Sequence, residues 1–178
     1  MKNSYYVRRF EANDAPAVSE LIIKTLRTSN RKDYSEEYIE NDVRLFSPQG
    51  VVQRAEWTHF YVICADGLIV GCGAIGPYWG REDESSLFNV FVLPEWQGRG
   101  VGRKIMEALE QDEFFLRAKR VEIPASVTAC EFYKKMGYTY KDGKILWMKN
   151  SSTVWKNTDK NGSLRIFSER FFKIIIIF

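Results

Sequence analysis

The segment from Val90 to Lys104 constrains the fold more than any other part of the sequence. It begins Val-Phe-Val-Leu-Pro, which predicts the end of a buried strand, and continues through Gly98, Gly100 and Gly102 into an apolar helical pattern. A strand that passes through a glycine-rich turn directly into a helix brings the unpaired N–H groups of the first helical turn together. The segment therefore predicts a mixed α/β fold.

Two properties of this turn favour binding of a phosphate group. The helix dipole adds partial positive charge to the exposed N–H groups, and the glycines let the backbone approach an anion closely. Arg99, Arg103 and Lys104 add further positive charge. The turn lacks the Gly-Lys-Ser/Thr ending of a P-loop and the glycine spacing of a dinucleotide fingerprint. Taken alone, it also fits a tight structural connection.

Length and composition favour one soluble, globular domain. The chain has 178 residues, of which 45% are hydrophobic and 28% charged, so it can bury a substantial core. Its net charge is only +3, and basic residues alternate with acidic ones. This pattern argues against nucleic acid as the main partner.

The cysteines and the two ends of the sequence favour a cytoplasmic protein. Cys64, Cys72 and Cys130 form no Cys-x-x-Cys pair and lie in apolar stretches, which disfavours disulfides and a zinc site. Met1–Phe10 lacks the apolar core of a secretory signal. Phe171–Phe178 is too short to span a membrane, and we expect it to pack on its own domain or against a second copy in a homodimer.

The first half of the chain predicts two helices between strands. The expected elements are a strand at Tyr5–Phe10, a helix capped by Asn13-Asp14, a helix from Ser35 to Phe46 stopped by Ser47-Pro48-Gln49-Gly50, and strands His59–Ala65 and Leu68–Ile75. Asp66-Gly67 between these strands is the clearest hairpin turn in the sequence.

The second half predicts a strand, helix, strand unit followed by a shorter helix. The expected elements are a loop holding Glu82-Asp83-Glu84, a strand at Ser86–Leu93, one long helix from Gly102 to Leu116, a strand at Val121–Ile123, a helix capped by Ser126 and ended by Gly137, and extended structure at Tyr138–Lys141. Asn150–Asn161 is polar and rich in turn formers, and Leu164–Phe167 predicts a last strand.

Two motifs resemble those of the GNAT acetyltransferases. Gln97-Gly98-Arg99-Gly100-Val101-Gly102 is similar to the family's Gln/Arg-x-x-Gly-x-Gly/Ala signature, and residues 129–138 are similar to its Ala-x-x-Phe-Tyr-x-x-x-Gly-Phe/Tyr helix and turn. The order of elements agrees from Tyr5 to Lys141. The resemblance implies a single GNAT domain over residues 1–144, with a mixed sheet of about six to seven strands that splays between strands four and five and is flanked by helices. Residues 145–178 form a divergent C-terminal segment.

The resemblance implies acetyl-CoA as cosubstrate and no metal. Backbone groups of the fourth strand would pair with the pantetheine arm, and the turn amides would hold the pyrophosphate. Ser126 replaces an asparagine that touches the cofactor in many relatives, so that contact is weaker here or made by the hydroxyl. The implied cofactor-binding residues are Val90, Phe91, Val92, Gln97, Gly98, Arg99, Gly100, Val101, Gly102, Arg103 and Ser126.

The resemblance also implies direct transfer of acetyl to a primary amine through a ternary complex. Tyr133 would protonate the leaving thiolate, although an aromatic residue at this position also fits a packing role. Ser86 stands where relatives carry a glutamate base, so Glu84 and Glu122 are the remaining candidates. Both also fit solvated carboxylates, and the amine could instead lose its proton through water.

Acidic residues favour a cationic acceptor, either a small amine or a protein amino group. They are Glu36, Glu37, Glu40 and Asp42 in the expected second helix and Glu82, Asp83 and Glu84 in the expected loop. The same residues also fit a solvated surface. The alternative function is a non-catalytic acyl-CoA-binding or sensing module. A protein-interaction or membrane-edge role would rest on the apolar end alone, and we expect no membrane partner.

Overall fold

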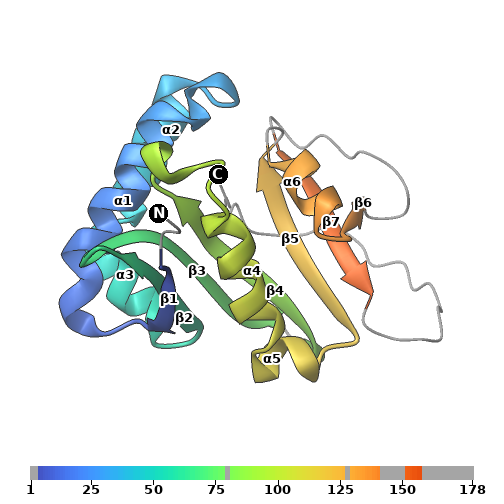
Figure 1. The fold of residues 1–178 in the computed structure, drawn as a ribbon. Coiled ribbons are helices and arrows are strands. Elements are labelled where there is room, and N and C mark those ends of the chain that lie inside the picture. The colour runs from blue at the N-terminus through green and yellow to red at the C-terminus, as the bar shows by residue number, and fades with distance from the viewer. Residues whose placement is uncertain (1–3, 79–80, 127–128, 141–150, 158–178) are drawn as a thin grey trace.

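The computed structural model describes residues 4–78, 81–126, 129–140 and 151–157. These residues form one mixed sheet with strands in the order β1-β2-β3-β4-β5-β7-β6. Helices cover both faces of the sheet (Figure 1). The prediction of an α/β fold with a mixed sheet flanked by helices is confirmed.

The N-terminal part contains one helix more than the sequence predicted. Its elements are β1 (Tyr6–Arg9), η1 (Ala12–Asp14), α1 (Ala15–Thr28), η2 (Asn30–Lys32), α2 (Glu36–Leu45) and α3 (Pro48–Ala55). Helix α2 ends before Ser47, as predicted, but Ser47 also caps the unpredicted helix α3 by accepting a hydrogen bond from the Gly50 N–H at 3.2 Å. Pro48 then occupies the first turn, where its missing N–H costs nothing.

The two expected N-terminal caps have different outcomes. Ser35 caps α2 as predicted, since its side chain accepts a hydrogen bond from the Tyr38 N–H. Asp14 precedes α1 but makes no side-chain cap for it. The Asp14 carboxylate instead receives both guanidinium arms of Arg8, at 2.6 and 2.8 Å, and this pairing lowers the pKa of Asp14. That cap prediction was wrong.

The predicted hairpin at Asp66-Gly67 is confirmed, and the fourth strand begins earlier than the sequence predicted. Strands β2 (His59–Ala65) and β3 (Leu68–Tyr78) meet at Asp66-Gly67, whose φ angles are 51° and 78°. Strand β4 (Arg81–Val92) starts at Arg81, so the acidic group Glu82-Asp83-Glu84 lies in a strand and not in a loop.

The expected long helix is divided into two. After η3 (Pro94–Trp96), α4 spans Val101–Glu110 and α5 spans Glu113–Leu116. Asp112 separates them because its side chain accepts a hydrogen bond from the Phe114 N–H at 2.9 Å and caps α5. The apolar periodicity continues across this break, which is why the sequence predicted one helix.

The C-terminal elements correct two further predictions. They are β5 (Arg120–Ser126), α6 (Cys130–Lys135), β6 (Thr139–Tyr140) and β7 (Ser151–Asn157). Ser126 ends β5 and does not cap a helix, since the residue before α6 is Ala129. Strand β7 forms within the polar stretch and pairs with both β5 and β6. The boundary at Lys144 and the strand at Leu164–Phe167 lie outside the described residues.

Two hydrophobic clusters lie on opposite faces of the sheet because strand side chains alternate. One cluster joins α1, α2 and α3 to the sheet, and the other joins α4, α5 and α6. Helix α4 approaches β3 closely at Gly73, where an added Cβ would lie 2.5 Å from Ile105 Cγ2 and 3.1 Å from Leu109 Cδ1. This contact sets the position of α4 and of the turn that precedes it.

We expect Gly73→Ala to lower the free energy of unfolding by about 1–3 kcal/mol, because the methyl group overpacks the contact between β3 and α4. Urea denaturation measures this loss. In a double-mutant cycle with Ile105→Ala, the loss in the double variant should be smaller than the sum of the single losses. Additive losses would contradict the close approach.

Candidate functional site

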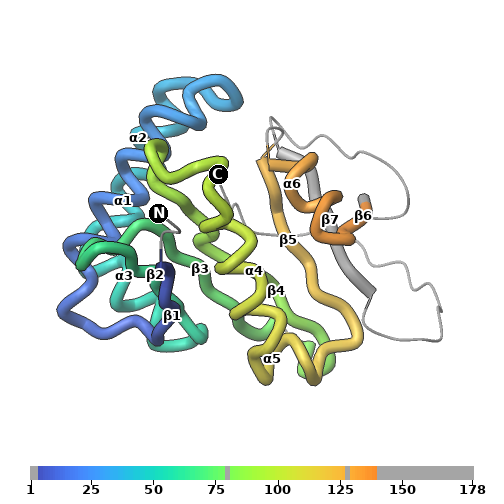
Figure 2. Tube along the Cα trace, viewed as in Figure 1, coloured from blue at the N-terminus to red at the C-terminus, as the bar shows by residue number. Residues whose placement is uncertain are grey.

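The candidate site begins where β4 and β5 separate. The parallel pairing between them runs from Glu84 opposite Arg120 to Ser86 opposite Glu122, and both strands continue beyond these positions. The Ser86 hydroxyl donates a hydrogen bond to the Glu122 carbonyl at 2.9 Å and closes the last paired position. Figure 2 shows the two strands diverging from there, so the expected splay between strands four and five is confirmed.

Pro124 suits the unpaired part of β5. Proline has no N–H to donate, so a strand tolerates it where one side lacks a partner. Pro124 lies beyond Glu122, the last β5 residue paired with β4, and opposite Thr153 of β7. The separation of the strands therefore accommodates this residue within β5.

The end of β4 directs alternate backbone groups toward β5. Phe91 lies opposite Cys72, and the Leu93 N–H donates to the Val70 carbonyl at 3.0 Å, so the backbone groups of Phe91 and Leu93 face β3. Because these groups alternate along a strand, those of Val90 and the N–H of Val92 face the side from which β5 has departed, whereas the Val92 carbonyl accepts hydrogen bonds from Gln97 and Thr25. Val90 and the Val92 N–H thus fit an added strand better than Phe91 does.

The glycine-rich turn presents N–H groups at the start of α4. Gly98 and Gly100 have φ angles of 71° and 88°, a left-handed conformation that glycine adopts without strain. The Lys104 N–H donates to the Gly100 carbonyl at 3.0 Å as the first hydrogen bond of the helix. The N–H groups of Val101, Gly102 and Arg103 therefore have no acceptor within the helix.

Side chains hold this turn against α1. The Gln97 Nε2 group donates to the Ser29 hydroxyl at 3.0 Å and to the Val92 carbonyl at 3.1 Å. Lys24 of α1 pairs with Glu95 at 2.7 Å. Gln97 thus fixes the turn with its side chain, a role that the motif alone did not indicate.

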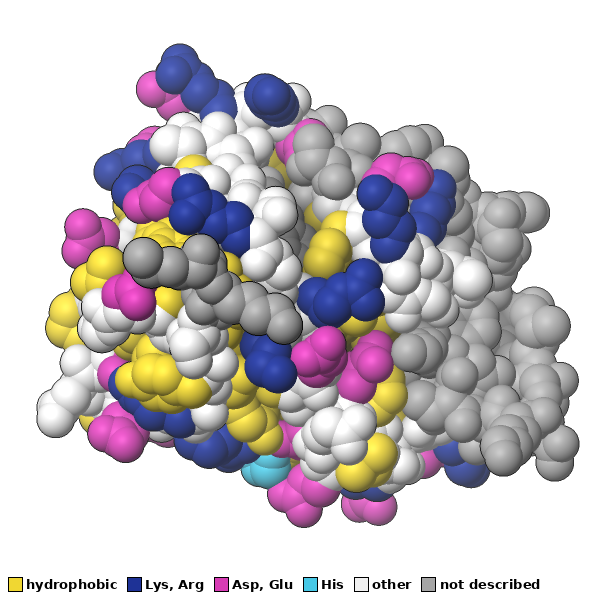
Figure 3. All heavy atoms as spheres, viewed as in Figure 1, with side chains coloured by type: hydrophobic (Ala, Val, Ile, Leu, Met, Phe, Trp, Pro, Cys, Tyr) yellow, Lys and Arg dark blue, Asp and Glu magenta, His cyan; other side chains and the backbone are white. Residues whose placement is uncertain are grey.

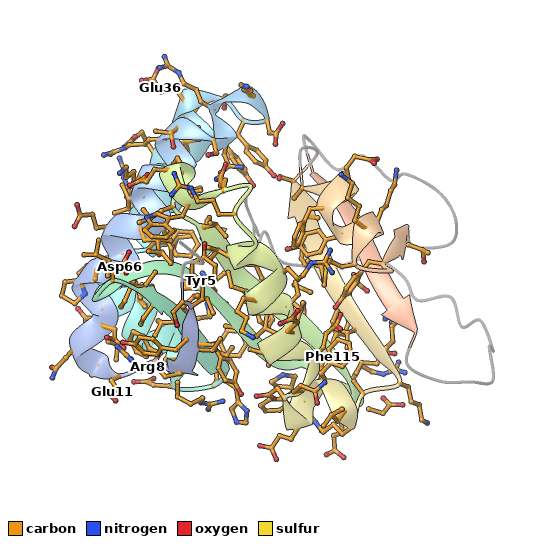
Figure 4. All side chains as sticks on the ribbon, viewed as in Figure 1. Tyr5, Arg8, Glu11, Glu36, Asp66 and Phe115 are labelled. Atoms are coloured by element: carbon orange, nitrogen blue, oxygen red, sulfur yellow. The ribbon has the colours of Figure 1, made fainter. Side chains whose placement is uncertain are left out.

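The positive charge expected around the turn is present on the surface. Figure 3 shows Lys and Arg side chains over α4 and α6. The Arg99 guanidinium lies 5.3 Å from the centre of the Trp96 ring, and the Arg99 carbonyl accepts a hydrogen bond from the Tyr5 hydroxyl. Tyr5, labelled in Figure 4, thereby ties the N-terminal segment to the turn.

Tyr133 and Ser126 are both buried beside the diverging strands. The Tyr133 side chain packs in the cluster of α4 and α6, and burial raises the pKa of its hydroxyl well above the usual value. Gly137 ends α6 with a φ of 87°, as predicted. The Ser126 carbonyl accepts a hydrogen bond from the Ala129 N–H at 3.1 Å, which connects β5 to α6.

The two candidate carboxylate bases share one cation. Glu84 lies 2.6 Å and Glu122 3.5 Å from the Arg120 Nη2 atom, and the Tyr78 ring covers the same guanidinium at 5.6 Å. Arg81 also contacts Glu84 at 3.2 Å. An acceptor amine would have to displace Arg120 to reach either carboxylate, so the geometry favours a structural role for this group.

The only histidine lies away from these residues. The His59 Nδ1 atom is 2.8 Å from Asp112 Oδ2, and the Tyr61 hydroxyl donates to the same oxygen at 2.6 Å. Asp112 also caps α5, so the cluster joins β2 to that helix. His59 begins β2, as the sequence predicted.

The described residues contain neither a cluster of metal ligands nor a helix that could span a membrane. Within the described ranges, no three or more His, Cys, Asp or Glu side chains are grouped so that they could hold a metal ion. None of the helices in the same ranges is long and apolar enough to cross a membrane.

Comparison with known proteins identifies the fold. Residues 56–140 match the family model described as Acetyltransferase (GNAT) domain, which includes β4, the turn and α6. The chain contains a GNAT acetyltransferase domain. Both motifs of the GNAT domain fall at the diverging ends of β4 and β5, one at the start of α4 and the other on α6.

Solved structures resemble the whole GNAT fold. PaiA N-acetyltransferase from Thermoplasma acidophilum, in complex with coenzyme A, has a TM-score of 0.75 at 18% identity, with 86% of this chain and 99% of that chain covered. A GCN5-related N-acetyltransferase from Rhodopseudomonas palustris has a TM-score of 0.71 at 23% identity, with 88% of this chain and 98% of that chain covered. YncA from Salmonella typhimurium, with its cofactor acetyl-CoA, has a TM-score of 0.63 at 14% identity, with 90% of this chain and 98% of that chain covered. No curated protein matches the chain.

We expect Arg120→Met to lower the free energy of unfolding by about 2–4 kcal/mol, because it removes the cation that two mostly buried carboxylates share and leaves Glu84 with its longer contact to Arg81. Urea denaturation measures the loss. Lys119→Met is the matched control, since Lys119 is exposed and its pair with Asp83 contributes about 1 kcal/mol or less. Equal losses in the two variants would contradict the structural role of Arg120.

Proposed function

We propose that this chain is an acetyl-CoA-dependent N-acetyltransferase that transfers acetyl directly to a primary amine in a ternary complex. The observation that carries the proposal is the left-handed glycine turn at the end of β4, which presents free N–H groups beside two diverging strands. The GNAT domain match and the coenzyme complexes of PaiA and YncA support the same choice. No metal is required for this chemistry.

The proposed cofactor site uses the backbone more than side chains. The N–H groups of Val101, Gly102 and Arg103 would bind the pyrophosphate together with the preceding turn from Gly98, where the helix dipole favours an anion. Val90 and the N–H of Val92 would pair with the pantetheine arm as an added strand, because these backbone groups face the side that β5 has left, whereas the Val92 carbonyl already accepts from Gln97 and Thr25. Gln97 would act indirectly by fixing the turn.

Tyr133 is the proposed proton donor. When the amine nitrogen attacks the thioester carbonyl, a C–N bond forms, the C–S bond breaks, the nitrogen loses one proton and the sulfur gains one. Burial keeps the Tyr133 hydroxyl protonated at neutral pH, so it can donate to the leaving thiolate. A strand amide near Val92 is the proposed donor to the oxyanion.

We assign the proton lost by the amine to water. The two carboxylates considered for this step, Glu84 and Glu122, both contact Arg120, whereas Ser86 is engaged with the Glu122 carbonyl. Glu84 or Glu122 would have to separate from Arg120 before it could accept a proton from the amine. Water needs no such rearrangement.

Gly100→Glu should abolish measurable acetyl-CoA binding, because it adds a side chain and a negative charge where backbone N–H groups face phosphate. Calorimetry measures the affinity, and Gln111→Glu adds the same charge at the opposite end of α4 as a control. Thermal melting of Gly100→Ala reports the cost of a side chain at the positive φ angle. Unchanged affinity in a folded Gly100→Glu variant would exclude the proposed phosphate site.

Tyr133→Phe should lower kcat by roughly 10² to 10⁴-fold and leave acetyl-CoA affinity nearly unchanged, because phenylalanine keeps the ring and removes the donor. Steady-state rates on one accepted amine and calorimetry with acetyl-CoA separate the two effects. If a folded variant turns over at the parent rate while chemistry limits turnover, Tyr133 is a packing residue.

A further inference from the structure

One partly buried arginine lacks a carboxylate partner within the described part of the chain. The partly buried arginines there are Arg8, Arg54, Arg81 and Arg120. Three of them pair with carboxylates at 2.6 to 3.2 Å, whereas the Arg54 guanidinium forms no ion pair and no hydrogen bond with the described residues. Burial lowers the pKa of Arg54, as expected for a guanidinium without a counter-charge. Because a charge removed from water is costly unless it is paired, Arg54 suits an anionic ligand.

Two aromatic rings hold the Arg54 side chain. Its guanidinium carbon lies over the Trp57 ring, 4.8 Å from the centre, and over the Phe88 ring, 5.6 Å from the centre. The two rings meet edge to face, with centroids 5.1 Å apart and an interplanar angle of 75°. These contacts stabilise the positive charge, but they give the guanidinium N–H groups no oxygen acceptor. We call these three residues the Arg54 cluster.

The backbone beneath the Arg54 cluster is fixed as well. At the end of α3, the Arg54 carbonyl accepts a hydrogen bond from the Thr58 hydroxyl at 2.8 Å. Trp57 packs against β3 at Gly76, where an added Cβ would lie 3.5 Å from the Trp57 Cε3 atom. A guanidinium that is already held in place can bind a ligand with little further loss of freedom, which favours affinity.

The Arg54 cluster reaches the surface on the face of the sheet opposite α4. Phe88 belongs to the hydrophobic cluster of α1, α2 and α3, whereas α4 packs in the cluster on the other face. Trp57 is 41% exposed and Arg54 is partly exposed, so a ligand can reach both side chains from solvent. A ligand bound here would therefore be separate from one bound at the glycine turn.

The chemistry of the Arg54 cluster favours a carboxylate over a phosphate. The planar guanidinium offers two parallel N–H groups, which match the two oxygens of a carboxylate. Phosphate sites commonly use the free N–H groups at the start of a helix. Arg54 lies instead in the last turn of α3, where the free backbone groups are carbonyls. The exposed part of Trp57 adds an apolar surface that suits an aromatic ring.

We propose that the Arg54 cluster binds a small molecule that carries one carboxylate and an aromatic ring. Two N–H groups of the guanidinium donate to the two carboxylate oxygens, and the exposed part of the Trp57 ring contacts the ring of the ligand. The ligand supplies the counter-charge that Arg54 lacks among the described residues. This site goes beyond the proposed acetyl transfer and does not depend on it.

Benzoate is the probe that tests this site. We would titrate benzoate and benzamide into the full chain, with and without coenzyme A, and measure the affinities by calorimetry. The parent should bind benzoate, and benzamide at least about tenfold more weakly, because the amide keeps the ring and removes the charge. Coenzyme A should leave benzoate affinity unchanged, and inorganic phosphate should not displace benzoate.

Variants of Arg54 separate the guanidinium from general charge effects. Arg54→Met should weaken benzoate binding by at least about tenfold, because methionine keeps an apolar side chain and has no N–H donor. Arg54→Lys should also bind benzoate more weakly, since an ammonium keeps the charge but loses the planar pair of donors. Arg31→Met removes the same charge from an exposed arginine of η2 and should bind benzoate as the parent does.

Thermal melting gives a second measurement of the same site. Benzoate should raise the melting temperature of the parent and of Arg31→Met, but not that of Arg54→Met, because a ligand stabilises only the protein that binds it. If Arg54→Met does not fold, Arg54→Lys provides the comparison. Loss of benzoate binding in a folded variant with unchanged coenzyme A affinity would support two separate sites.

Every other outcome counts against the Arg54 site. The proposal is wrong if the parent does not bind benzoate, or if benzamide or phosphate binds as well as benzoate does. It is also wrong if a folded Arg54→Met or Arg54→Lys variant keeps the parent affinity. Competition between benzoate and coenzyme A would place the probe at the glycine turn and would exclude the Arg54 cluster as its site.

Discussion

The hydrogen bond from the Ser86 hydroxyl to the Glu122 carbonyl closes the last position at which β4 and β5 pair. Just before it, Arg120 holds Glu84 and Glu122 together, so the two strands are joined at one end by both a ladder and an ion-pair network. Beyond it, the strands are free to diverge. The turn and Tyr133 are both placed with respect to this divergence.

Local signals predicted the parts of the site that depend on neighbouring residues in the chain. The glycine turn, the Asp66-Gly67 hairpin and the Gly137 helix end each require a backbone conformation that few residues adopt, and that requirement is visible in the sequence. The break between α4 and α5 was hidden because Asp112 interrupts the backbone without interrupting the apolar pattern. Strand β7 was hidden because its pairing with β5 and β6 decides its structure.

Charge was the least informative property of the sequence. Glu84 and Glu122 looked like candidate bases, and only the fold shows that Arg120 lies between them. Conversely, nothing in the pattern of α2 distinguished Asp42 from its acidic neighbours, because burial depends on the contacts of the whole domain.

The place of β7 has a consequence for how this protein is made. Because β7 lies between β5 and β6, β6 leaves the ribosome before the strand that joins it to the sheet. During that interval the backbone of β5 on this side is an open edge, able to pair with the strand of another chain. The interval ends only when residues 151–157 have left the ribosome and paired with β5, so any delay in this step prolongs the exposure of the edge.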